Sequence, residues 1–137
     1  MFPMPLAFPL ALWSLVESQL TRALPEEACG LLAGHGGLVE QVYPVDNALH
    51  SPTAYRMDAA GQVRAMLAIE QAKLALLGIY HSHPVGPAIP SATDLRQASY
   101  PDALYLICSP APGQAWQARA FWLRDGVADE EPLVWTR

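Results

Sequence analysis

Two histidines and a nearby aspartate are the residues of this chain best suited to chemistry. His81 and His83 stand one residue apart, directly after Leu74–Tyr80, a short apolar run that is typical of a buried strand. If this strand continues through His83, both imidazoles project to the same face, because side chains alternate along a strand. Two imidazoles on one face at the end of a strand are a suitable pair of metal ligands.

The sequence after the strand supplies a third ligand. Pro84 ends the strand because it has no N–H to donate, and a loop rich in proline and glycine follows. Ser91 has the position of a helix N-cap, and the carboxylate of Asp94 can turn back toward the loop. Two imidazoles and one carboxylate leave the fourth position of a zinc site for water, which is the catalytic arrangement. Zinc in such a site makes water a nucleophile near neutral pH, but residues 81–94 contain no base to take its proton.

Length and composition limit the class of protein. The 137 residues are 52% hydrophobic and 15% charged, so we expect residues 1–137 to form a single globular domain. The net charge of −5 and the lack of a Lys/Arg run argue against a nucleic-acid binder. The two cysteines, Cys29 and Cys108, fit a reducing compartment. The apolar N-terminus lacks the basic start of a signal peptide and contains prolines, so we expect a cytoplasmic protein without a membrane span.

Hydrophobic periodicity predicts helices interspersed with strands. We expect helices over 10–23, 59–73 and 92–99, and strands over 26–34, 38–45, 74–83, 103–108, 116–123 and 127–135. The apolar sides of the first two helices are expected to comprise Leu12, Leu15, Val16 and Leu20, and Val63, Met66, Leu67, Ile69 and Leu74. Asp58 is placed to cap the second helix. Together these elements predict an α/β fold, a mixed β-sheet with helices packed on it.

The complete pattern resembles the motif of the JAMM family of metalloproteases, also called MPN-plus. The motif consists of His-Ser-His-Pro at 81–84, seven residues from Pro84 to Pro90 between His83 and Ser91, then Asp94, and an acid upstream of Cys-Gly-Leu-Leu. The resemblance extends from Pro25 to about Cys108 and keeps the family's order of elements. It implies a zinc peptidase or isopeptidase of the small stand-alone prokaryotic type, with a fold like that of cytidine deaminases.

The resemblance also implies a role for each matching residue. His81, His83 and Asp94 would bind one zinc ion per chain, Glu27 would be the general acid/base, and Ser91 would help to hold the oxyanion. In such a mechanism a carboxylate deprotonates the attacking water and then protonates the leaving amine. A hydroxyl donor stabilises the tetrahedral oxyanion.

The pattern leaves open which of two adjacent acids is the base. Glu26 and Glu27 are neighbours, and the distance to Cys29-Gly30 favours Glu27. Asn47 stands in a polar loop, where asparagine either steadies a loop on the substrate side or, more usually, serves turn chemistry.

The implied substrate is a ubiquitin-like or sulfur-carrier protein cleaved after its C-terminal Gly-Gly. A strand edge such as Leu31–Ala33, or the 84–90 loop, would bind an extended tail by strand addition. The 84–103 region lacks the insertions with which eukaryotic members hold ubiquitin chains, so chain-selective deubiquitination is not expected. A zinc hydrolase of a small-molecule amide and a non-catalytic MPN scaffold remain as alternatives. A deaminase would need a Pro-Cys-x-x-Cys motif, which is missing, and scaffolds usually lose a ligand or the glutamate.

Overall fold

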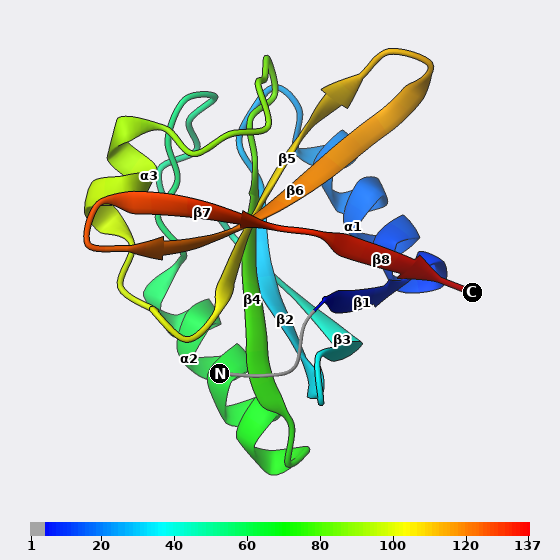
Figure 1. Cartoon of the computed structure of the whole chain (residues 1–137). Helices are drawn as coiled ribbons and strands as arrows, with labels where there is room; N and C mark the ends of the chain where they lie inside the picture. Colours follow the sequence, from blue (N-terminus) through cyan, green and yellow to red (C-terminus); the bar gives the residue numbers. More distant parts are fainter. Residues whose placement is uncertain (1–4) are drawn as a thin grey trace.

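Eight strands form one mixed sheet in the order β7-β6-β5-β4-β2-β3-β1-β8 (Figure 1). In the computed structural model the described chain runs from residue 5 to residue 137, so the first four residues of the apolar N-terminus lie outside it. The strands are β1 (Leu6–Pro9), β2 (Cys29–His35), β3 (Leu38–Val45), β4 (Ala75–Ser82), β5 (Leu104–Ala111), β6 (Gln114–Arg124), β7 (Val127–Glu131) and β8 (Leu133–Thr136). The helices are α1 (Leu10–Ala23), α2 (Ala59–Gln71) and α3 (Ala92–Gln97). The predicted mixed sheet with helices packed on it is confirmed.

Each face of the sheet carries its own apolar core. Leu20 of α1 belongs to one core together with Tyr80, whereas Ile69 of α2 belongs to the other together with Ile79. The neighbours Ile79 and Tyr80 face opposite sides because side chains alternate along β4. His81 therefore faces the α2 side of the sheet. None of the helices in the described range is long and apolar enough to cross a membrane.

Three residues assigned to the apolar sides of helices are exposed instead. Leu15 is 57% exposed, Val63 58% and Leu67 51%, and these predictions were wrong. On α1 the buried stripe contains Trp13, whose ring contacts Phe8 at a centroid distance of 5.9 Å. Both helices carry apolar residues on more than one side, so periodicity does not decide which stripe meets the sheet.

The C-terminal region forms two edge strands where the sequence predicts one. Residues 127–135 divide at Pro132 into β7 and β8, because proline has no N–H for a ladder. β8 lies at the opposite edge from β7 and pairs in parallel with β1, a strand that the periodicity did not predict.

β5 also runs beyond its predicted end at Cys108, through Pro110. This proline is tolerated there because the pairing of β5 with β4 ends at Cys108.

The pairing of β2 with β4 places the candidate site. The two strands are antiparallel, and Cys29 stands opposite His81. Ser82 N–H donates to the Ala28 carbonyl at 3.0 Å, so the pairing continues past Cys29 and brings Glu27 to the level of His83. β2 is also paired with β3 along its length. The expectation that Leu31–Ala33 offers a free edge to a peptide is therefore wrong.

A glycine lets the strand pair close around a buried tyrosine. Gly30 stands opposite Tyr80, and a Cβ atom at Gly30 would overlap the phenol ring. The Tyr80 hydroxyl donates to Gln19 Oε1 on α1, and Gln19 Nε2 donates to the Cys29 carbonyl at 2.9 Å. These two hydrogen bonds join α1 to Cys29 of β2 and Tyr80 of β4, next to the candidate site.

We expect Gly30→Ala to destabilise the protein by about 1–3 kcal/mol, because the added methyl group forces the Tyr80 ring out of its place. Urea unfolding of the two proteins measures this difference. In a Tyr80→Ala background the same glycine substitution should cost much less, because the overlapping ring is gone. An equal cost in both backgrounds would show that Tyr80 is not the obstacle.

Candidate metal centre

The rings of His81 and His83 and the carboxylate of Asp94 converge at the end of β4. The two Nε2 atoms lie 3.1 Å apart, and Asp94 places Oδ1 at 3.1 Å from His81 Nε2 and Oδ2 at 3.2 Å from His83 Nε2. Ligand atoms at the usual zinc distances of about 2.0–2.2 Å lie about 3.3–3.6 Å apart in a tetrahedral site. The two nitrogens and the carboxylate therefore suit zinc in both type and spacing.

Neighbouring groups hold each of the three side chains. Tyr55 stacks on the His81 ring with a centroid distance of 4.4 Å and an interplanar angle of 24°. His83 Nδ1 lies 2.9 Å from the Pro87 carbonyl oxygen. Since a carbonyl only accepts, Nδ1 donates this bond, and Nε2 is the ring nitrogen that faces Asp94 and is left to bind a metal.

Asp94 is fixed by the predicted helix cap. Its carboxylate accepts the Ser91 N–H at 2.8 Å, and the Ser91 hydroxyl oxygen accepts the Asp94 N–H at 3.0 Å. This reciprocal capping box confirms Ser91 as the N-cap of α3. The cap directs Asp94 back toward the two histidines.

The electrostatics of His81 and Asp94 favour the states that bind metals. Burial opposes protonation of His83, but its hydrogen bonds with Asp94 and the Pro87 carbonyl outweigh burial and raise its pKa. Burial lowers the pKa of His81, so its imidazole is neutral. Burial opposes ionisation of Asp94, but the hydrogen bonds from the His81 and His83 rings outweigh it and hold the pKa of Asp94 well below its ordinary value. A neutral imidazole and an ionised carboxylate are the ligand forms that metals require.

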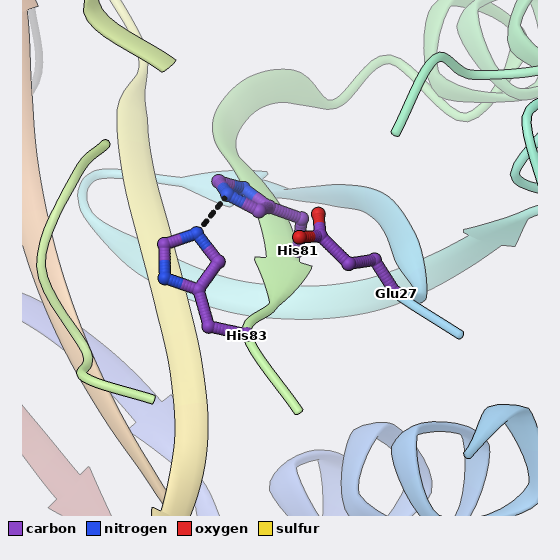
Figure 2. A group of neighbouring side chains, drawn as sticks. All are labelled: Glu27, His81 and His83. Atoms are coloured by element: carbon purple, nitrogen blue, oxygen red, sulfur yellow. Dashed lines mark hydrogen bonds between the residues drawn. The ribbon is translucent and has the colours of Figure 1, made fainter. Parts of the chain in front are cut away.

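Glu27 lies beside this group on the chain segment that leads into β2 (Figure 2). A carboxylate oxygen of Glu27 and one ring nitrogen of each histidine lie within 4.8 Å of one another. Glu27 is thus a second candidate for third ligand, but Asp94 is the better one because its oxygens are within 3.2 Å of both rings. Glu27 is near enough to act on a group bound there.

Burial raises the pKa of Glu27 to about 7. The charge of His83 lowers this pKa and that of Asp94 raises it, but burial has the largest effect. A carboxyl group with such a pKa exchanges protons readily near neutral pH. Glu26, the alternative base, has an exposed side chain that pairs with His50 at 3.2 Å. Of the two acids it is Glu27 that the fold buries beside the histidines.

Sequence reasoning missed two residues that support the site. Tyr55 comes from the loop before α2, and no local pattern indicates that this loop folds over His81. Ser82 stands between the histidines and accepts the Ala28 N–H at 2.8 Å. Strand alternation does place Ser82 on the opposite face from the histidines, which was the one available signal.

A cavity of about 320 Å³ lies close to the group, in the lower range of ligand-binding sites. It shares Tyr55, Gln97 and Tyr105 with a small hollow that reaches His81 and Asp94. The site thus has a neighbouring space on the α2 side of the sheet.

Comparisons with known proteins agree on one family. The profile described as "Prokaryotic homologs of the JAB domain" matches residues 9–124. The CysO-cysteine peptidase of Mycobacterium tuberculosis is 40% identical over 111 residues, which cover 80% of this chain and 76% of that protein. The desampylase of Haloferax volcanii is 45% identical over 89 residues, 63% of this chain and 64% of that protein. The solution structure of a Desulfitobacterium hafniense protein matches with a TM-score of 0.85 and 36% identity, over 95% of this chain and 92% of that one.

Proposed function

Because the chain belongs to the family of prokaryotic homologs of the JAB domain, we propose that it is a zinc-dependent peptidase that cleaves after the C-terminal Gly-Gly of a ubiquitin-like or sulfur-carrier protein. The observation that carries the proposal is the convergence of His81, His83 and Asp94 within 3.2 Å, beside the buried carboxyl group of Glu27. The relatives named as a CysO-cysteine peptidase and a desampylase support this substrate class.

In the proposed mechanism, His81, His83 and Asp94 would hold a zinc ion, which when bound acidifies water and polarises a carbonyl oxygen. Glu27 takes a proton from the attacking water. It then delivers this proton to the nitrogen of the leaving amine. The pKa of Glu27 near 7 suits both transfers, since the same group must accept and release a proton in each turnover.

Ser91 is the proposed donor to the oxyanion. Its oxygen already accepts the Asp94 N–H, so the hydroxyl hydrogen is left to donate to a second group. Because the capping box fixes Ser91 next to Asp94, this donor is held in place before the substrate arrives.

Limited access to the group favours a tail without side chains. His81 and Glu27 are 0% and 5% exposed, and the side chains of His83 and Asp94 are 12% and 10% exposed. A Gly-Gly tail presents only backbone, so it reaches such an enclosed group most easily. The 84–90 loop joins His83 to Ser91 and is the remaining segment beside which an extended tail can lie.

The two alternative functions, a small-molecule amidase and a non-catalytic scaffold, predict different zinc binding and different hydrolysis products. A small-molecule amidase would hydrolyse small amides and leave every carrier intact. A scaffold would neither bind zinc nor hydrolyse either substrate. A complete set of His81, His83, Asp94 and Glu27 argues against the scaffold.

We expect the purified protein to contain one zinc ion per chain, bound through the convergent ligands. The double variant His81→Ala/His83→Ala should lose this metal, as measured by elemental analysis. His50→Ala is the matched control, because His50 is an exposed histidine whose ring pairs with Glu26 and not with the proposed ligands. Full zinc content in the double variant would show that the ligands lie elsewhere.

The substrate prediction is tested with a β-grasp carrier protein that ends in Gly-Gly. The carrier is extended by one cysteine, by a short peptide, or by a lysine-linked protein, and mass spectrometry identifies the products of the zinc-loaded protein. We expect cleavage directly after Gly-Gly with each extension. Glu27→Gln should keep the zinc and the fold and lose about 10²–10⁴-fold in turnover, because it cannot transfer the proton.

Glu26→Gln is the matched control and should turn over normally. Normal turnover of Glu27→Gln together with an inactive Glu26→Gln would reverse the assignment of the base. Cleavage of a small amide with no cleavage of any carrier would favour the small-molecule amidase.

For Ser91→Ala we expect turnover to fall by about 10²–10³-fold, with a much smaller change in KM. The lost cap should also lower the free energy of unfolding by about 1 kcal/mol, which urea unfolding measures alongside. A lower stability with unchanged turnover would mean that Ser91 serves only as a helix cap.

A further inference from the structure

The side-chain amide of Asn47 uses both of its hydrogen-bond donors and both of its acceptor positions. All its partners belong to segments next to the candidate site. Nδ2 donates to the Glu27 carbonyl at 3.0 Å and to the Ala54 carbonyl at 3.1 Å. Oδ1 accepts the N–H of Leu49 at 3.0 Å and that of Arg56 at 3.1 Å. Asn47 is only 7% exposed, so these bonds replace those that water would make.

The first of these partners is the backbone of Glu27, the proposed base. The carbonyl of Glu27 accepts from Asn47, and the N–H of Glu27 donates to the Ser51 carbonyl at 2.8 Å. Glu27 precedes β2, which begins at Cys29, so both of its backbone groups are bonded to the 46–57 loop. The position of the Glu27 carboxyl group therefore depends on that loop.

Two other partners flank Tyr55, whose ring covers the proposed zinc ligand His81. Tyr55 lies between Ala54 and Arg56, and the backbone of each of these neighbours is bonded to the Asn47 amide. The Tyr55 ring stacks on His81 at 4.4 Å. One amide group thus connects the backbone of Glu27 to the residue packed on His81.

Turn formation alone does not account for these bonds. An asparagine that only shapes a turn accepts the N–H two residues on, which here is the bond from Leu49. The bonds to Glu27 and Arg56 reach residues 20 and nine positions away in the sequence. Only a carboxamide offers two donors and two acceptors, and aspartate would face the two carbonyl groups with oxygen alone.

We propose that Asn47 is a positioning residue of the peptidase, which sets the carboxyl group of Glu27 and the ring of His81 relative to each other. The inference rests on the proposed function and adds one residue on which the turnover of the peptidase depends. A displacement of about 1 Å at a reacting group can cost about 100-fold in rate. None of the hydrogen bonds of the Asn47 side chain reaches the proposed ligands themselves, so its effect passes through Glu27 and Tyr55.

The first test compares Asn47→Asp and Asn47→Ala with the unmodified protein on a carrier that ends in Gly-Gly-Cys. We expect kcat to fall by about 10–100-fold, while KM and zinc content stay within about twofold. Asp58→Ala is the control, because Asp58 caps α2 directly after the same loop and its loss lowers stability without touching Glu27. Asp58→Ala should keep its kcat at a temperature where all the variants remain folded.

A double variant tests whether Asn47 acts through Glu27. If it does, Asn47→Ala added to Glu27→Gln should lower the residual turnover by less than about twofold. A further loss equal to that of the single variant would overturn the proposal. Should Asn47→Ala fail to fold, the isosteric Asn47→Asp takes its place in this comparison.

Hydrogen exchange of the zinc-free protein provides a readout that does not need activity. In the Asn47 variants the amide of Glu27 and those of the 46–57 loop should exchange at least about tenfold faster, whereas Asp58→Ala should leave the Glu27 amide unchanged. Unaltered exchange at Glu27 would overturn the inference even if the carrier is cleaved. Absence of carrier cleavage by the unmodified protein, with faster exchange in the Asn47 variants, would instead reject the substrate and keep the positioning role.

Discussion

The antiparallel register of β2 against β4 is the constraint on which the candidate site depends. Cys29 opposite His81 fixes where every later residue of β4 lies relative to the segment that carries Glu27. A shift by one residue would turn His81 to the other face, because side chains alternate. Gly30 protects this register, since it leaves room for Tyr80 at the next pair along the strands.

The site shows how a buried polar cluster is kept in one arrangement. A buried polar group costs free energy unless it has a partner. Ser91 supplies partners for Asp94, the Pro87 carbonyl for His83, and Ser82 for the backbone of Ala28. Ser82, Pro87 and Ser91 belong to the same segment as the ligands, whereas Tyr55, which stacks on His81, comes from the loop before α2. The ligands are therefore oriented partly by their own motif and partly by a distant loop.

The loop before α2 has a larger role than its sequence suggests. Through Asn47 it is bonded to Glu27, and through Tyr55 it covers His81. In the proposed peptidase, the acid/base group and the metal ligands would therefore share one support. Such a support is fitting where a carboxyl group must act on a molecule bound a few ångströms away.

The sequence by itself predicted most of the elements and the three candidate ligands that the fold brings together. The apolar run over 74–80 and the cap signal of Ser91 and Asp94 are local, so the strand that leads into His-Ser-His and the short helix after it could be predicted. The resemblance to a known motif singled out Glu27. The tertiary structure alone decided that Leu15, Val63 and Leu67 face outward, that β8 pairs with β1, and that Tyr55 and Asn47 hold the site. These features depend on contacts between residues far apart in the chain, which neither hydrophobic period nor turn chemistry encodes.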